Sequence, residues 1–371
     1  MSETQKHTKP NVPNLRFPGF EGEWVQFTLG ELTELFSQRN KKRVEYPLFS
    51  VTNSRGFVNQ QEQFEDREMK GEDIAAYKII SPGEFAYNPA RINVGSIARY
   101  DGDSDCIISS LYVCFRAKKE LVDPQLFLHI LKSPKMVYNY GINGEGGVRV
   151  YLFYPNFARI RVKLPSVAEQ CKIASFLDLI EERIRLQNKI IEKYQSLIRA
   201  ITREYLWERQ CLHYTLLSEL SPVIASGKSK PSIGDYPLYG STGIIGACSS
   251  NVYKGEMILV ARVGSIGQIQ LINTEGCGVT DNTLIVKAGD LNKYIYYFLR
   301  AFEFKRITTG TTQPLITGSG LKSILVPILP RKTRDTLVNA LSAIDERIAM
   351  EQAVLYHSEK LKGYLIGALF I

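Results

Sequence analysis

The sequence predicts a mixed α/β protein of the α+β kind, built from two tandem halves that each end in a long helix. Three features predict this fold. Short motifs recur in the same order in both halves, and each half closes with apolar residues at a mean spacing of 3.5. The segments between them hold short β-branched or aromatic runs bounded by Gly, Asp or Asn. A chain of 371 residues is also too long for one ordinary core and comfortable for two.

An ordered set of landmarks carries the internal repeat. A single match means little, but all of them recur in one order. The offset between the copies shrinks along the chain, from the Tyr-Pro-Leu motif to the Leu-Pro motif, as insertions into surface loops produce. The sequence therefore predicts a duplicated unit. The paired landmarks are 27–32 with 214–220, 46–49 with 236–239, 83–84 with 255–256, Arg91 with Arg262, 94–97 with 263–266 (VGSI in both) and 164–165 with 329–330.

The end of each half predicts a coiled-coil helix. Steps of four and three residues from Ile173 meet mainly apolar side chains, and the same steps from Leu337 do so in an identical register. A polar residue, Gln187 or Glu351, falls in the middle of each seam, where such residues fix register and partner orientation. The predicted seam consists of Ile173, Leu177, Ile180, Ile184, Gln187, Ile191 and Ile198, followed by Leu337, Leu341, Ile344, Ile348, Glu351, Leu355 and Leu365.

These helices are too long for either half to cover. From residue 173 to residue 205 the first helix spans roughly 48 Å at ~1.5 Å per residue. We expect the two helices to pack on each other as an antiparallel coiled coil with pseudo-twofold symmetry. A helix wrapped on its own half and a homodimeric coiled coil are the alternatives. The predicted domains are an N-terminal extension (1–20), two globular domains (21–165 and 211–330) and two helical spacers (166–210 and 331–371).

Shorter elements are also predicted within the globular domains. The first long helix is expected to begin with a capping box, in which Ser166 and Glu169 satisfy each other's backbone N–H groups. Strands are expected at 105–115, 257–262 and 283–286, and short helices at 124–131 and 293–301.

Composition limits the classes of function. The net charge of +8 and the pI near 9.0 favour an acidic partner, nucleic acid first. No segment approaches the ~18–20 apolar residues of a membrane span, and the N-terminus has no apolar run of signal-peptide length. The six cysteines form no Cys-x-x-Cys pair and only four histidines are present, so no metal site is predicted. Free thiols in a reducing cytoplasm are expected.

No catalytic residue is predicted. An amino-methyltransferase needs an Asn/Asp-Pro-Pro-Tyr/Phe loop for its target base, and the nearest string, 88–91 (NPAR), lacks the second Pro and the aromatic residue. No paired-carboxylate nuclease pattern stands out. The glycine-containing strings at 144–147 and 310–313 are not followed by the Gly-Lys-Ser/Thr of a phosphate-binding loop.

Several polar clusters are instead candidates for DNA contact. Lys and Arg neutralise phosphates, and Arg, Asn and Gln read base edges in the major groove. Each residue taken alone is equally compatible with an ordinary surface or turn position, and the VGSI element with a structural turn common to both halves. The candidates are Arg39, Lys41, Lys42, Arg43, Arg91, Asn93, Arg149, Lys228, Lys230, Arg262, Thr311, Thr312 and Gln313.

Several strings add to the evidence of the duplication, although none of them is diagnostic alone. They are 14–24 (NLRFPGFEGEW), 86–96 (AYNPARINVGS), 236–243 (YPLYGSTG), 164–170 (LPSVAEQ) and the Ile-x-Glu-Arg-Ile strings at 180–184 and 344–348. Through the duplication and these strings together, the chain resembles over essentially its whole length the specificity subunits of type I restriction-modification enzymes.

The resemblance implies a non-catalytic protein with two target recognition domains, each reading one part of a split double-stranded DNA sequence. The paired helices would set the distance between these domains and dock two methyltransferase subunits, with motor-nuclease subunits completing the restriction form. The chain itself would bind no cofactor; S-adenosylmethionine, ATP and Mg would belong to the partners. A recognition subunit for a fused methyltransferase-nuclease, a standalone DNA-modifying enzyme and a coiled-coil scaffold without a DNA role are the alternatives.

Overall fold

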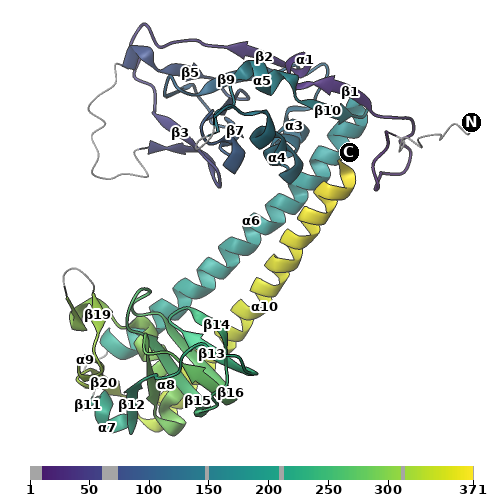
Figure 1. The fold of residues 1–371 in the computed structure, drawn as a ribbon. Helices are drawn as coiled ribbons and strands as arrows, with labels where there is room; N and C mark the ends of the chain where they lie inside the picture. The colour runs from purple at the N-terminus through teal and green to yellow at the C-terminus, as the bar shows by residue number, and fades with distance from the viewer. Residues whose placement is uncertain (1–10, 61–73, 147–149, 209–212, 311–313, 371) are drawn as a thin grey trace, which may run out of the picture. The chain divides into compact units, whose positions relative to one another are not determined.

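The computed structural model describes residues 11–60, 74–146, 150–208, 213–310 and 314–370. The chain forms two compact units. One comprises Met1–Leu186 and Leu355–Ile371, and the other comprises Gln187–Val354. The boundary falls inside both long helices, so each unit holds the beginning of one and the end of the other (Figure 1). No helix in these described ranges combines the length and apolarity that a membrane span requires.

A four-stranded antiparallel sheet, with strand order β2-β9-β6-β7, forms the centre of the first unit. Two-stranded ladders β1-β10, β3-β4 and β5-β8 accompany it. The elements are β1 (Val25–Thr28), α1 (Leu29–Leu32), β2 (Thr33–Phe36), β3 (Phe49–Thr52), β4 (Gly56–Asn59), η1 (Ile74–Ala76), β5 (Lys78–Ile80), β6 (Phe85–Tyr87), η2 (Ile92–Val94), β7 (Ile97–Arg99), β8 (Cys106–Ile108), β9 (Val113–Ala117), α3 (Pro124–Leu131), α4 (Pro134–Asn143), α5 (Tyr154–Arg159), β10 (Arg161–Leu164) and α6 (Val167–Arg203).

Aromatic side chains fill the core of this unit. The ring of Phe85 stacks on Phe115 with centroids 5.2 Å apart, and Phe127 meets both rings edge-on. Leu177 of α6 and Leu369 near the C-terminus belong to the same buried cluster. The end of the chain therefore stabilises the first globular domain.

The second unit contains a six-stranded sheet with strand order β12-β17-β15-β16-β13-β14, in which β13 and β16 are parallel. Ladders β11-β20 and β18-β19 complete it. The elements are β11 (His213–Leu216), α7 (Leu217–Leu220), β12 (Val223–Ser226), β13 (Tyr236–Gly240), β14 (Gly243–Cys248), β15 (Tyr253–Ala261), β16 (Ile269–Val279), β17 (Thr283–Lys287), η4 (Gly289–Leu291), α8 (Asn292–Ala301), η5 (Phe304–Ile307), β18 (Thr308–Thr309), β19 (Leu315–Ile316), α9 (Gly318–Lys322), β20 (Leu325–Ile328) and α10 (Arg331–Leu369), with a π-helical turn, η3 (Glu204–Glu208), at the end of α6.

The two units share one topology. The order β2-β9-β6-β7 in the first corresponds to β12-β17-β15-β16 in the second. In both, the first strand pairs antiparallel with the last strand before the long helix, as β1-β10 and β11-β20. The predicted duplication is therefore confirmed in three dimensions.

The long helices pack together in antiparallel fashion, as predicted. In the first unit, Lys362 near the end of α10 bonds Glu181 near the start of α6. In the second, the Gln187 amide donates to the Glu351 carboxylate within the seam. Gln187 and Glu351 occupy the same step of the two predicted seams, so each contacts its own counterpart in the repeat. The predicted seam residues are all buried or half-buried.

Two local predictions need correction. Residues 105–115 form two strands, β8 and β9, because a turn closed by the Tyr112 N–H and the Ser109 carbonyl separates them. The two strands pair in different sheets. At the start of α6, the hydroxyl of Ser166 accepts from the Glu169 N–H as expected, but the Glu169 carboxylate binds Arg16 at 2.7 and 2.8 Å. The capping box is therefore replaced by an ion pair to the N-terminal segment.

Candidate nucleic-acid interface

In the second unit, backbone bonds gather the ends of several strands around Arg262. The Arg262 N–H donates to the Asn282 carbonyl, and the Arg262 carbonyl accepts from the Ile316 N–H, both at 3.0 Å. The Ser241 hydroxyl donates to the same Asn282 carbonyl at 3.3 Å. The loops after β15, before β17 and between β13 and β14 therefore meet the β18-β19 hairpin at one place.

The guanidinium group of Arg262 has one buried donor without a partner among the described residues. One Nη1 contact reaches the Ser226 hydroxyl at 3.4 Å, while the buried Nε has no hydrogen-bond partner among the described residues. A buried donor that lacks a hydrogen-bond partner costs ~1–3 kcal/mol of stability. Because Nε itself is covered, a guanine edge or a phosphate would be bound through the outer nitrogens of the guanidinium group.

The basic segment 226–230 lies beside Arg262. Its backbone approaches the sheet so closely that a Cβ on Gly227 would lie 2.4 Å from the Thr280 carbonyl oxygen, so only glycine fits. The neighbouring Ser226 contacts Arg262, and Lys228 and Lys230 are exposed. The structure thus brings Lys228 and Arg262, predicted separately, into one neighbourhood.

The first unit has the equivalent connection at Arg91, which lies between β6 and β7 as Arg262 lies between β15 and β16. The Ser96 N–H bonds the Arg91 carbonyl at 3.1 Å, and the Ser96 hydroxyl donates to the Val51 carbonyl of β3 at 2.7 Å. Gly95 has a φ of 92°, and Gly264 in the second unit has a φ of 76°. The VGSI element is therefore a structural turn in both units. Arg91 is exposed beside it and Asn93 is half-buried.

The other basic cluster of the first half lies elsewhere. The backbone of Arg39 forms an isolated antiparallel β-bridge with Lys78 of β5, and the Asn40 N–H donates to the Tyr77 carbonyl at 2.9 Å. These bonds attach the exposed residues Arg39, Lys41, Lys42 and Arg43 next to β5. The Arg91 turn instead contacts β3. The remaining candidates, Arg149, Thr311, Thr312 and Gln313, lie outside the described residues.

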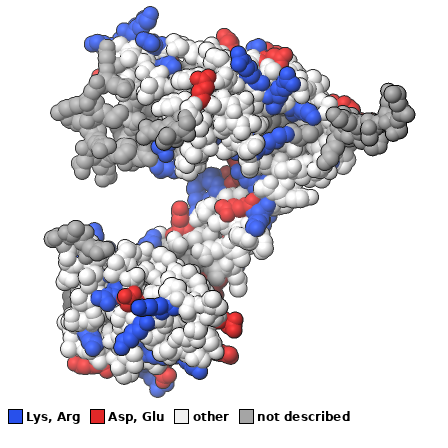
Figure 2. All heavy atoms as spheres, in the orientation of Figure 1, with Lys and Arg blue, Asp and Glu red and all other residues white. Residues whose placement is uncertain are grey.

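Charges of both signs are mixed over the surface that Figure 2 shows. Lys and Arg lie scattered over the visible face of both units, with Asp and Glu among them. This agrees with a net charge of only +8 on 371 residues. Specific loops rather than a broad polyelectrolyte surface are therefore the candidates for DNA contact.

Comparison with known proteins identifies the family. The family model described as type I restriction modification DNA specificity domain matches residues 21–195 and 220–356. The chain belongs to this family. It is a non-catalytic DNA specificity subunit of a type I restriction-modification system.

Individual relatives are distant but match over nearly the whole subunit. A putative type I restriction enzyme MjaX specificity subunit from Methanocaldococcus jannaschii is 21% identical, with 90% of this chain and 88% of that protein covered. The crystal structure of the S subunit from M. genitalium superposes with a TM-score of 0.64 at 14% identity, covering 97% and 99% of the two chains. A structure described as concerning complex assembly and conformational transition of the type I R-M system has a TM-score of 0.55 at 16% identity, covering 94% and 97%.

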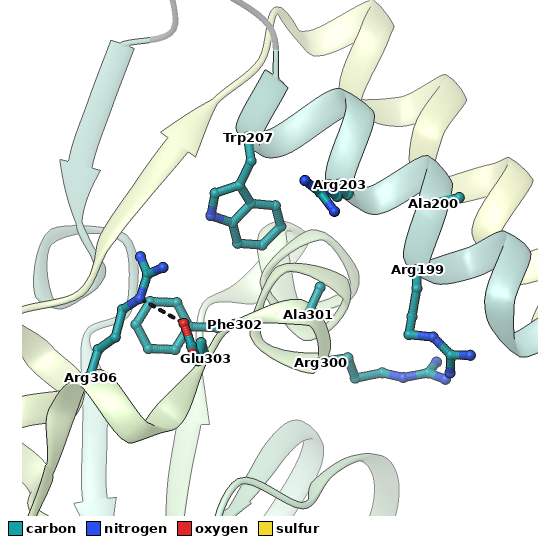
Figure 3. Close-up of a pocket in the computed structure, with 9 residues that line it drawn as sticks. All are labelled: Arg199, Ala200, Arg203, Trp207, Arg300, Ala301, Phe302, Glu303 and Arg306. Atoms are coloured by element: carbon teal, nitrogen blue, oxygen red, sulfur yellow. Dashed lines mark hydrogen bonds and ion pairs between the residues drawn. The ribbon is translucent and has the colours of Figure 1, made fainter. Parts of the chain in front are cut away.

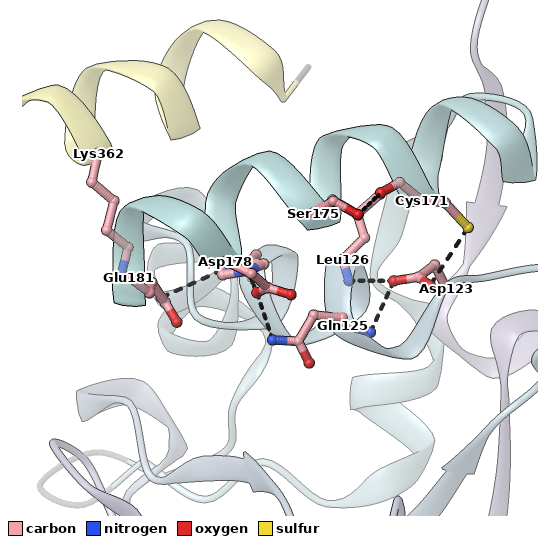
Figure 4. A network of polar contacts seen from close by, with 9 residues as sticks. Asp123, Gln125, Leu126, Cys171, Ser175, Asp178, Glu181 and Lys362 are labelled. Atoms are coloured by element: carbon pink, nitrogen blue, oxygen red, sulfur yellow. Dashed lines mark hydrogen bonds and ion pairs between the residues drawn. The ribbon is translucent and has the colours of Figure 1, made fainter. Parts of the chain in front are cut away.

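The subunit also contains a polar cluster that the sequence did not predict. The two ring nitrogens of buried His129 face Asp178 at 2.9 Å and Glu181 at 3.5 Å. Gln125 donates to Asp178, and Lys362 donates to Glu181 (Figure 4). These three acidic and imidazole groups lie within 4.8 Å of one another, close enough to share a metal ion. Because Lys362 already neutralises Glu181, we interpret this His129 cluster as a set of polar contacts that holds α3 against the two long helices.

The second unit supports this interpretation. At the equivalent positions of α8 and α10, the Tyr297 hydroxyl lies 3.3 Å from the Ser342 hydroxyl, and Arg300 pairs with Asp345 at 2.6 Å. Burial raises the pKa of Tyr297 well above its ordinary value, so the hydroxyl stays protonated and able to donate. The same contact is therefore made with different chemistry. The signal that could have found it is polar residues repeating at matched positions of the short and long helices.

Proposed function

We propose that the subunit recognises a bipartite DNA target, with residues 21–165 reading one part and residues 211–330 reading the other. The observation that carries this proposal is the repeated Arg-bearing turn. Arg91 and Arg262 occupy the same place in one duplicated topology, and each stands among strand ends that differ between the units. A shared frame with different surrounding loops suits two readers of different half-sites.

The long helices serve as the spacer between these readers. Helix α6 has 37 residues and α10 has 39, so each measures about 55–60 Å at ~1.5 Å per residue. Their seam is specified by the polar pair Gln187 and Glu351 as well as by apolar residues, which fixes one register. Half-sites roughly one helical turn of DNA apart, about 34–36 Å, suit such a spacer.

The helices also dock two methyltransferase subunits. An apolar stripe lies one position before the seam on each helix, and much of it is exposed. Leu186 and Leu197 of α6 are 46% and 44% exposed, and their counterparts in the repeat, Met350 and Leu361 of α10, are 60% and 49% exposed. Exposed apolar stripes on a monomer mark interaction sites. Two copies of one stripe fit two copies of one partner, whose helices would extend the bundle.

The chemistry then belongs to the partners. The methyltransferase subunits would use S-adenosylmethionine to methylate adenines that are flipped out of the duplex. Motor-nuclease subunits, with ATP and Mg, would complete the restriction form. This chain supplies position and sequence recognition and binds none of these cofactors.

Co-expression of the subunit with its methyltransferase subunit, followed by genome-wide mapping of methylated adenines, tests the proposal. We expect one split motif with a spacer of fixed length in which any sequence is accepted. A continuous motif would contradict the two-reader arrangement. A stable complex that leaves the genome unmethylated would contradict the proposed role in modification.

A further inference from the structure

The second unit contains an arginine-lined pocket that no predicted base-reading residue explains. It has a volume of about 940 Å³ and lies where the end of α6 meets the end of α8 and the segment after it (Figure 3). Among the described residues that line it, four are arginines, none is a lysine, and a single one is acidic. The lining residues are Arg199, Ala200, Arg203, Trp207, Arg300, Ala301, Phe302, Glu303 and Arg306.

Carboxylates pair with two of these arginines, and a third has a neutral partner. Arg306 pairs with Glu303 at 3.0 Å and Arg300 with Asp345 at 2.6 Å. Arg199 donates to the neutral hydroxyl of Ser196, at 2.8 Å. Arg199 and Arg300 also line a second, smaller pocket that adjoins the first, and in Figure 3 their side chains point the same way. A bound anion would relieve the repulsion between these guanidinium groups.

The internal repeat provides a control for the structural role of these arginines. Arg199 and Arg203 lie four residues apart on α6, a spacing at which like charges destabilise a helix. The corresponding positions of α10, in the register that pairs Ile173 with Leu337, are Gly363 and Gly367. The corresponding end of α10 therefore packs against the first globular domain without the positive charges of these two arginines. Arg199 and Arg203 therefore have no charged counterpart in the first unit.

We propose that this pocket binds phosphates of the DNA backbone beside the half-site read by the second domain. The proposal rests on the function proposed above and adds a contact that carries no sequence information. Arginine presents a planar fork that matches phosphate in bidentate fashion, and its exclusive use here suits that ligand better than a diffuse lysine surface.

The connection of the pocket to the Arg262 cluster favours DNA over an acidic polypeptide. Arg306 lies near the end of η5, and the chain passes directly from there into β18. Strand β19 of that hairpin bonds the Arg262 carbonyl through the Ile316 N–H. The pocket and the loops around Arg262 are thus linked through the paired strands β18 and β19. The first unit has glycines at the equivalent helix positions, so the extra contact is made on one side of the target.

The test uses two double variants, each in complex with the methyltransferase subunit. The first carries Arg199→Gln and Arg203→Gln, and the control carries Lys322→Gln and Lys332→Gln. The control lysines are exposed, lie in the same unit and do not line the pocket, so both variants lose two charges. The Kd for target and non-target duplexes is measured from low to high KCl. We expect the arginine variant to lower the slope of log Kd against log salt by ~1–2, corresponding to one or two phosphates lost. The loss should be equal for both duplexes, with an unchanged methylation motif.

A slope equal to that of the lysine control overturns the pocket proposal while leaving the proposed function intact. Weaker assembly with the methyltransferase subunit, without a change in DNA binding, also overturns it and identifies the ligand as an acidic segment of the protein partner. If the unmodified complex does not bind DNA, the proposed function itself fails. An unchanged thermal unfolding midpoint in the arginine variant verifies that the fold is retained.

Discussion

At the scale of single residues, Arg262 offers a direct test of base reading. The Nε of Arg262 is buried without a partner among the described residues. The residue lies next to Ser226 and Asn282, where several loops meet. We expect Arg262→Gln to cost about 1–3 kcal/mol in discrimination between bases. The methylation motif should relax at a position of one half-site only. Arg91→Gln is the matched variant, and its effect should fall in the other half-site. Relaxation of the same half-site by both variants would contradict the assignment of one reader to each unit.

The cysteines give a second residue-scale prediction. Burial raises the pKa of Cys106 and of Cys114 to about 12, so at pH 8 each is almost entirely the unreactive thiol. Cys171 is exposed on α6. We expect iodoacetamide to modify Cys171 at least ten-fold faster than either buried thiol in the native protein, as measured by peptide mapping. Comparable rates at the three positions would show that the first unit opens locally. Cys171→Ser supplies the control peptide.

Which residues could be predicted follows from the range of the interactions. The seam residues obey a local period, so the sequence alone identified them. The contacts of the His129 cluster join residues about 50 and about 180 positions apart in the chain, and no local pattern links them. Arg262 was predicted as a polar candidate. Its partnerless Nε depends on which loops fold beside it, and only the structure supplies that.

At the scale of elements, the polar pair in the helix seam lowers the stability of the seam while it fixes the register of the two helices. Gln187 and Glu351 are both buried, and Arg347 also binds Glu351. Replacing a buried polar or ionic group by apolar residues is often neutral or stabilising, by up to ~4 kcal/mol. We expect Gln187→Leu combined with Glu351→Leu to be at least as stable as the parent in urea unfolding. Gln187→Leu alone leaves a buried carboxylate with one partner fewer and should lose about 1–3 kcal/mol. A double variant less stable than the single one would contradict this account.

The exposed stripe gives the second element-scale prediction. Leu186→Glu combined with Met350→Glu places charge on both copies of the proposed docking stripe, at side chains that are about half exposed. Because a charge in an apolar interface must be desolvated, we expect at least ten-fold weaker assembly with the methyltransferase subunit by light scattering or calorimetry. Ile233→Glu is the control, since Ile233 is fully exposed and lies off the helices. Unchanged assembly in the stripe variant would place the docking surface elsewhere.

Elements differed in how well the sequence predicted them, for a physical reason. Residues 124–131 form a helix with the predicted bounds because Asp123 caps it and Pro124 begins it, and both signals are local. The break at 109–112 was not predicted because β8 and β9 are equally apolar. Their separation is set by pairing to β5 in one case and to β6 and β2 in the other. Such a choice depends on residues distant in sequence.

At the scale of the whole molecule, duplication explains the asymmetries as well as the repeats. Two units with one topology need share only the residues that make the frame, such as the glycine of the VGSI turn and the first-to-last strand ladder. The surroundings are free to diverge, as the six-stranded sheet of the second unit and its arginine pocket have done. The order of landmarks in the sequence predicted the frame. It gave no information on the divergent parts, where base reading is proposed to take place.

The spacer role makes the last prediction. Duplicating residues 181–187 in α6 together with residues 345–351 in α10 inserts one heptad into each helix and preserves both the seam and the exposed stripe. Each helix becomes about 10 Å longer at ~1.5 Å per residue. At ~3.4 Å per base pair that equals about three base pairs. Methylome sequencing of the complex should therefore show a spacer longer by up to about three base pairs.

The two half-site sequences should not change in this variant, because neither globular domain is altered. Insertion into α6 alone is the matched control. It shifts one seam against the other, separates Gln187 from Glu351 and should abolish methylation. An unchanged spacer in the double insertion would refute the spacer role of the helices. New half-site sequences would show that the helices, and not only the globular domains, take part in reading the bases.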